Sequence, residues 1–139
     1  MSDDEVWAFL AADPPHTGKL ATTRHDGGPH VAPIWYVVAD RALVFMTGAE
    51  TVKGRNLRRD PRAAVCVDDE RPPFSFVTVS GTVEISEDLT EMLHWSTLIG
   101  GRYMGADQAE AYGARNATPG ELLLRLQPNR IVSAADLAE

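Results

Sequence analysis

The sequence is poor in several features that define well-known classes of protein. It has a single cysteine, Cys66, which excludes an internal disulfide and, alone, a cysteine-based metal cluster. No apolar run approaches the ~20 residues that a membrane-spanning helix needs. The first ten residues, MSDDEVWAFL, are acidic where a secretory signal would be basic. We therefore expect a cytoplasmic protein with no membrane partner, built as a single domain over residues 1–139.

Positive charge is also scarce. The chain has 13 Lys+Arg against 20 Asp+Glu, which gives a formal net charge of −7. A general nucleic-acid binder usually presents a broad positive face that displaces counterions from the phosphates. The charge balance therefore argues against nucleic acid as a partner.

The sequence contains no motif that supplies a catalytic nucleophile or a set of metal ligands. The patterns G-x-S-x-G, G-x-x-x-x-G-K-[ST] and G-x-G-x-x-G are all missing, which argues against serine hydrolases, P-loop proteins and Rossmann dinucleotide sites. The histidines form no ligand pair at helical spacing; they are His16, His25, His30 and His94. We expect no metal site, and the catalytic residues are not identifiable from the sequence.

Hydrophobic periodicity and turn signals predict a mainly β protein. The predicted strands lie at 18–25, 30–38, 42–47, 63–67, 74–86, 121–126 and 130–133. A first predicted helix follows a capping box at 2–5, and a second spans 51–59. A third begins at 86, and a glycine-broken helical segment covers 100–116. In the longest strand, one face carries Val77, Val79, Gly81, Val83 and Ile85. About six antiparallel strands with short helices favour a small closed barrel.

One basic segment stands out in the acidic chain. Residues 53–62 (KGRNLRRDPR) carry five of the basic residues and one acid. The start of a helix offers unsatisfied N–H groups and a partial positive charge. The side chains that would add to it are Thr47, Thr51, Lys53, Arg55 and Asn56. Together they predict a phosphate cradle, and the alternative is a solvated helix face with arginines for solubility.

The segment 29–36 (PHVAPIWY) is apolar on both faces and contains two aromatic residues. Because Pro33 lacks an N–H, we expect a bulge or a free strand edge beside it. Such a segment suits a flat wall for a planar ring, and the alternative is an ordinary buried strand. A phosphate cradle and a flat wall, without an evident acid, base or nucleophile, fit a protein that holds a redox cofactor.

These residues also carry a resemblance. The segments 29–36, 53–62 (K-x-R-N-L-R-R-D-P-R) and 79–83 (VSGTV) follow one another as in the split β-barrel flavin and deazaflavin oxidoreductases of the pyridoxamine-phosphate-oxidase-like superfamily. The sequence is most similar to the actinobacterial branch that uses coenzyme F420, over roughly residues 5–135. The segments Arg102–Gly105, Glu110–Tyr112 and 119–123 resemble the same branch.

The resemblance implies a six-stranded antiparallel FMN-binding split barrel that forms a homodimer with two cofactor sites at the subunit interface. It implies roles for particular residues as well. Lys53 and Arg55 would bind the cofactor phosphate with support from Asn56 and Thr47. The ring system would lie along the backbone of Ala32, Pro33, Ile34 and Trp35. Arg58 or Arg59 would meet the anionic tail, and the partner subunit would supply Arg102 and Tyr103.

The function that follows is an oxidoreductase that transfers a hydride from reduced F420 to an unsaturated small molecule. Solvent, Tyr36 or Tyr103 would supply the proton. F420 is favoured over FMN because its anionic tail suits the extra arginines and because the sequence is more similar to the F420-using branch. Two alternatives stay open: an FMN-dependent oxidase or reductase of the same fold, and a non-catalytic carrier of F420 or flavin.

Overall fold

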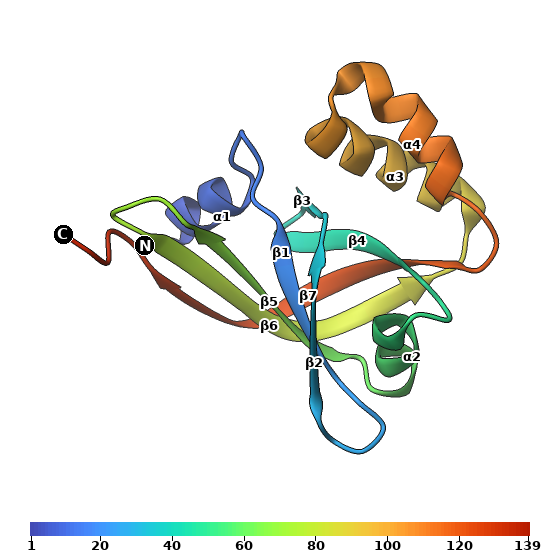
Figure 1. Cartoon of the computed structure of the whole chain (residues 1–139), viewed down its shortest axis with the longest axis horizontal. Helices are drawn as coiled ribbons and strands as arrows, with labels where there is room; N and C mark the ends of the chain where they lie inside the picture. Colours follow the sequence, from blue (N-terminus) through green and yellow to red (C-terminus); the bar gives the residue numbers. More distant parts are fainter.

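The computed structural model describes all 139 residues, and the chain forms one antiparallel sheet flanked by helices (Figure 1). The sheet has seven strands: β1 (Gly18–Thr23), β2 (Pro29–Ile34), β3 (Val37–Ala39), β4 (Ala42–Gly48), β5 (Arg62–Asp69), β6 (Ser75–Ser86) and β7 (Glu121–Ala134). The helices are α1 (Asp3–Leu10), α2 (Val52–Arg59), α3 (Leu89–Met104) and α4 (Ala109–Asn116), with a short 3-10 turn at Ala106–Gln108. None of the helices combines the length and the hydropathy that crossing a membrane requires.

The first three helices begin at residues whose side chains cap the free amides of the first turn. Ser2 and Glu5 form the predicted capping box of α1. Thr51 caps α2 by accepting a hydrogen bond from the Gly54 N–H, which confirms the predicted helix in the basic segment. Asp88 caps α3 through the amides of its first turn. Local sequence therefore determines where these helices start.

The glycines of the helical region between residues 100 and 116 bring α3 and α4 close together. α3 continues through Gly100 to Met104, and Gly105 then breaks the helical segment predicted at 100–116 before it resumes as α4. A Cβ on Gly100 would lie 2.5 Å from the Cβ of Tyr112, and a Cβ on Gly113 would lie 2.1 Å from Thr97 Oγ1. The two helices consequently lie side by side, away from α1 and α2 (Figure 1).

The order of strands in the sheet is β2-β1-β5-β6-β7-β4-β3, and every neighbouring pair is antiparallel. The two edge strands, β2 and β3, follow one another in the chain with only Trp35 and Tyr36 between them. The sheet must therefore curl until its edges approach, but no ladder of hydrogen bonds joins them. The predicted closed barrel of six strands is corrected to an open, curled sheet of seven.

Two strand boundaries differ from the prediction. The predicted strand 30–38 is divided because its two halves pair with opposite edges of the sheet, β2 with β1 and β3 with β4. The free outer edge of β2 confirms the expectation drawn from Pro33. In contrast, the predicted strands at 121–126 and 130–133 are one strand, β7, which pairs with β6 past an irregularity at Gly81. A Cβ on Gly81 would lie 1.9 Å from the Gln127 carbonyl oxygen, so glycine permits this bulge.

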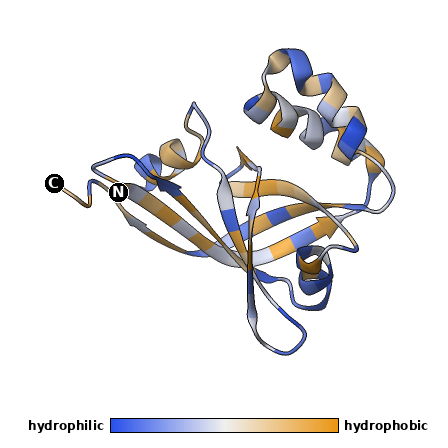
Figure 2. Ribbon diagram, viewed as in Figure 1, coloured by the Kyte–Doolittle hydropathy of each residue, from blue (hydrophilic) through white to orange (hydrophobic).

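The main hydrophobic core is a cluster of 18 buried residues that come mostly from the sheet, with contributions from α1 and α2. Hydrophobic residues lie along the central strands, and the loop between β1 and β2 is hydrophilic (Figure 2). The largest fully buried side chains come from α1 and α2 as well as from the sheet; they include Leu10, Leu20, Tyr36, Phe45, Leu57, Leu124 and Leu126. In β6 the predicted face is buried from Val77 to Val83 and reaches the surface at Ile85, which is exposed.

Candidate functional site

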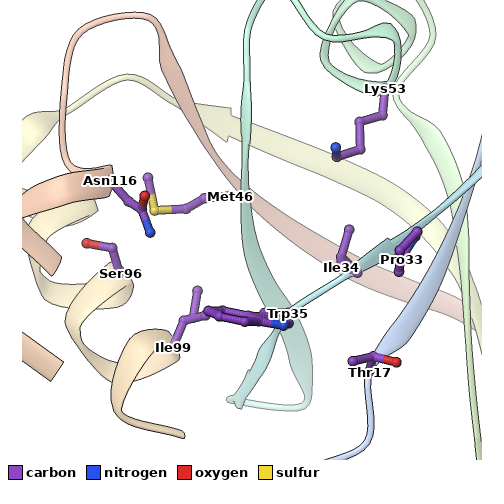
Figure 3. Close-up of a pocket in the computed structure, with 9 residues that line it drawn as sticks. All are labelled: Thr17, Pro33, Ile34, Trp35, Met46, Lys53, Ser96, Ile99 and Asn116. Atoms are coloured by element: carbon purple, nitrogen blue, oxygen red, sulfur yellow. The ribbon is translucent and has the colours of Figure 1, made fainter. Parts of the chain in front are cut away.

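A pocket of about 320 Å³ lies where the end of β2, the strand β4, the start of α2 and the α3–α4 pair meet (Figure 3). Its lining residues come from segments far apart in the sequence; they are Thr17, Pro33, Ile34, Trp35, Met46, Lys53, Ser96, Ile99 and Asn116. Lys53 and Asn116 point into the pocket from different sides (Figure 3). The pocket thus combines an apolar wall with a small number of polar groups, as ligand sites commonly do.

The cationic end of the pocket is the first turn of α2. Lys53 Nζ makes no ion pair and no hydrogen bond within the chain, and the amides of Val52 and Lys53 donate to no acceptor. A helix start with free N–H groups attracts an anion, and an unpaired ammonium beside it strengthens that attraction. This end of the pocket can hold a phosphate group.

The threonines of this turn are occupied by each other and by the backbone. The Thr51 hydroxyl donates to the Gly48 carbonyl at 2.7 Å and accepts from the Gly54 N–H at 3.1 Å. Thr47 Oγ1 lies 3.1 Å from Thr51 Oγ1. Because the Thr51 proton is already used, Thr47 is the donor in that contact. Neither hydroxyl has a proton left for a phosphate, so the two threonines shape the turn.

The acids nearby neutralise most of the basic segment. Arg55 pairs with Glu50 at 2.9 Å, Arg58 with Glu87 at 2.7 Å and Arg62 with Asp60 at 2.7 Å. The Arg59 guanidinium donates to the Thr23 carbonyl and to the Asn56 side chain. Of the basic residues that the sequence singled out for phosphate binding, only Lys53 lines the pocket.

Asn56 faces the sheet and not the pocket. Its side chain is buried, and its Nδ2 donates to Thr22 Oγ1 at 3.0 Å. This bond fixes α2 against β1. The predicted contact of Asn56 with a phosphate is therefore absent from this arrangement, and its role is to hold the helix that carries Lys53.

The apolar wall is formed by the end of β2. Pro33, Ile34 and Trp35 line the pocket, whereas Ala32, which was predicted with them, does not. The Trp35 side chain is 36% exposed and stacks on Tyr103, with the ring centroids 5.1 Å apart and the planes at 4°. A second aromatic ring, Tyr112, lies 6.0 Å from the indole. The indole is consequently held in place between the sheet and α3.

Arg102 and Tyr103 act within their own chain. The Arg102 guanidinium donates to the carbonyls of Tyr36 at 2.6 Å and Leu10 at 2.9 Å. The Tyr103 hydroxyl donates to the His16 carbonyl at 2.8 Å and accepts from the Tyr36 N–H at 3.3 Å. These bonds tie the last turn of α3 to the junction between β2 and β3, so both side chains are engaged before any partner subunit is added.

Tyr36 does not face the pocket. Its ring is fully buried, and its hydroxyl donates to the Leu10 carbonyl at 2.6 Å. Burial raises the pKa of Tyr36 to about 12, although the nearby Arg102 opposes that shift. The suggestion that Tyr36 relays a proton to a substrate is therefore wrong, because its hydroxyl is directed into the core. Tyr103 is similarly committed, since its proton goes to a carbonyl.

Sequence reasoning missed five of the lining residues: Thr17, Met46, Ser96, Ile99 and Asn116. They come from one loop, one strand and two helices, and no local pattern relates them. The Ser96 hydroxyl donates to the Gly113 carbonyl at 2.9 Å, which joins α3 to α4. The side chain of Asn116 makes no hydrogen bond within the chain, so its amide is free to meet a ligand.

Comparison with known proteins gives a consistent result. The family model described as pyridoxamine 5'-phosphate oxidase matches residues 2–133. A conserved hypothetical protein from Mycobacterium tuberculosis is 28% identical, with a TM-score of 0.85 over 100% of this chain and 89% of the other. A protein named F420 reductase is 27% identical, with a TM-score of 0.70 over 90% of this chain and 94% of the other. A FAD-binding protein from Mesorhizobium loti, at 22% identity, supports the fold alone, with a TM-score of 0.70 over 96% of this chain and 92% of the other.

Proposed function

Because the chain belongs to the pyridoxamine 5'-phosphate oxidase family, we propose that it is an F420-dependent oxidoreductase that reduces an unsaturated small molecule. The observation that carries this proposal is Lys53. It is the one basic side chain at the start of α2 without an acidic partner, and it lines the same pocket as the Trp35 indole. A phosphate and a planar ring of one ligand could therefore be bound together.

The phosphate would be bound by Lys53 Nζ and by the free amides of the first turn of α2. A hydrogen bond between charged groups is typically worth about 1.5–3 kcal/mol. Thr51 and Thr47 would contribute by fixing the turn, and Asn56 by fixing the helix to β1. Arg55 is paired with Glu50 and is exposed, so it would have to leave that partner to join the phosphate.

The ring would lie along Pro33, Ile34 and Trp35, in a pocket that Met46 and Ile99 also line. When bound, reduced F420 supplies the hydride from its ring carbon. The apolar side chains would orient the reactants and exclude water from them. Since Tyr36 and Tyr103 direct their protons to backbone carbonyls, solvent is the proton source that we propose.

We also propose a homodimer that completes the site. The pocket of a single chain, at about 320 Å³, lies near the lower limit of ~300 Å³ for small-molecule sites. A cofactor with a phosphate-bearing tail therefore needs more surface than one chain encloses. The outer edge of β2, beside the pocket, is unpaired, and Val31 on that strand is 64% exposed. Light scattering of the purified protein tests for the dimer.

The preference for F420 over FMN rests more on sequence similarity to an F420 reductase than on arginines that could bind an anionic tail. The 27% identity to an F420 reductase over most of both chains supports F420. The arginines that would meet an anionic tail are all engaged within the chain, Arg58 with Glu87 and Arg59 with Thr23 and Asn56. These arginines would bind an anionic tail only if the tail displaced those contacts.

The deciding experiment is a titration of the purified protein with F420 and with FMN, followed by turnover assays with enones and quinones. Binding of F420 with oxidation of its reduced form by one of these acceptors supports the proposal. A protein that binds FMN and ignores F420 would instead be a flavin-dependent oxidase or reductase. Tight binding of F420 without turnover of any acceptor would favour a carrier.

A further inference from the structure

Glu121 is an acidic side chain beside the cap of α2, outside the lining of the pocket that contains Lys53. It is the first residue of β7 and pairs with Gly48, the last residue of β4. Its Oε2 atom is buried and has no hydrogen-bond partner. A Cβ on Gly48 would lie 3.2 Å from Thr51 Cγ2 and 3.8 Å from Glu121 Oε2. The carboxylate and the cap of α2 therefore lie over the same face of Gly48.

The charges around this point nearly cancel. Burial raises the pKa of the Glu121 carboxyl, and the positive charge of nearby Lys53 opposes that shift. The two are beyond ion-pair distance, because no such pair forms within 4.0 Å. On the flanks, Glu50 neutralises Arg55 and Glu87 neutralises Arg58. One free cation and the partial charge of the helix start remain to balance one half-buried acid and an incoming anion.

We propose that Glu121 is a specificity-determining residue, which makes this site favour a singly charged phosphodiester over a doubly charged phosphomonoester. The inference rests on the proposed function, since it concerns the same phosphate site. Each additional negative charge on the ligand is repelled by a carboxylate that is half-buried and whose Oε2 atom has no hydrogen-bond partner.

The distinction separates the two cofactors considered above. The phosphate of F420 links two parts of the molecule and carries one charge, whereas the terminal phosphate of FMN carries about two charges above its second pKa of ~6. Glu121 thus gives a physical reason for a preference that the arginines do not explain.

The sharpest test keeps the ring constant and changes only the phosphate. Wild-type protein is titrated at about pH 8 with FMN and with the monomethyl phosphate ester of FMN, which has the same ring and one charge fewer. We expect the ester to bind about five- to tenfold more tightly than FMN. Equal affinities, or tighter binding of FMN, would overturn the proposal without the use of any variant.

A variant then assigns the effect to this side chain. Glu121→Gln keeps the size of the residue and removes its charge, so the affinities for FMN and its ester should come within about twofold of each other. Glu87→Gln is the matched control, since it removes an exposed acid that is paired with Arg58 on the outside of the helix, and it should retain the preference for the ester. A preference that is unchanged in Glu121→Gln would show that another group causes it.

The two proposals fail in different ways. If FMN, its ester and F420 all fail to bind the wild-type protein, the proposed function is wrong. If they bind and the phosphate charge has no effect, the proposed function stands and the role of Glu121 is wrong.

Discussion

The indole of Trp35 lies nearly parallel to the phenol ring of Tyr103, with their planes at 4° and their centroids 5.1 Å apart. Trp35 belongs to the two-residue break between the edge strands β2 and β3, and Tyr103 belongs to the last turn of α3. The contact therefore joins the open edge of the sheet to the helix that closes the pocket. It also fixes the orientation of the ring that lines the proposed cofactor site.

Replacing Tyr103 by leucine should loosen Trp35 and weaken cofactor binding. The stacking contact is worth roughly 0.5–1.5 kcal/mol, so we expect a comparable loss of binding free energy, measured by titration with F420. Tyr103→Phe keeps the ring and loses only the hydroxyl contacts to His16 and Tyr36. It should bind the cofactor almost as wild type does, and an equal loss in both variants would contradict the role of the stack.

Replacing Lys53 by alanine should weaken cofactor binding by roughly 1–3 kcal/mol, the scale of a charge-assisted contact. Lys53 has no partner in the chain, so its removal should leave the thermal stability nearly unchanged. The other lysine, Lys19, provides a matched control because it is paired with Asp68 at 2.8 Å and lies outside the pocket lining. Lys19→Ala should bind the cofactor as wild type does. A Lys53→Ala protein with unaltered affinity would show that the phosphate is bound elsewhere.

Local signals predicted α2 and its start well, and the reason is physical. Thr51 caps the helix through Gly54, a contact over three residues that needs no tertiary structure. Lys53 follows directly from that placement, since a residue two positions past the cap must lie at the helix start. The segment ending in Trp35 was recognised from its apolar character, and three of its four predicted residues do line the pocket.

Partners distant in the sequence were not predictable in the same way. Arg58 carries charge in the sequence, but its neutralising acid, Glu87, lies 29 residues away and is identified only by the fold. Nothing near Asn56 in the sequence indicates that it faces Thr22, 34 residues away. The pocket wall from α3 and α4 required the packing of two helices, and Glu121 became significant only when β7 was paired with β4.

The close approach of α2 to the end of β4 depends on glycine at position 54. A Cβ there would lie 2.1 Å from the Gly48 carbonyl oxygen, which is backbone and cannot rotate away. Gly54→Ala should therefore cost about 1–3 kcal/mol of unfolding free energy and should displace Lys53, so that cofactor affinity falls as well. Gly101→Ala is the control, because the nearest atom there is the Cβ of Ala109 at 3.2 Å. A Gly54→Ala protein with wild-type stability in urea would contradict this packing.

The buried hydroxyl of Tyr36 should make the protein less stable in alkaline solution. Its pKa is raised by burial to about 12 in the folded chain, whereas an unfolded tyrosine titrates near ~10. Between these values the unfolded state binds fewer protons than the folded state, so the free energy of unfolding falls as pH rises from about 10 to about 12. Urea unfolding at a series of pH values measures this slope.

Tyr36→Phe has no hydroxyl to titrate, so its stability should fall less steeply with pH. The variant should also be less stable overall, because it loses the bond to Leu10. Tyr103→Phe retains Tyr36 and should retain that part of the slope. If Tyr36→Phe and wild type lose stability in parallel over this range, the alkaline sensitivity comes from another group.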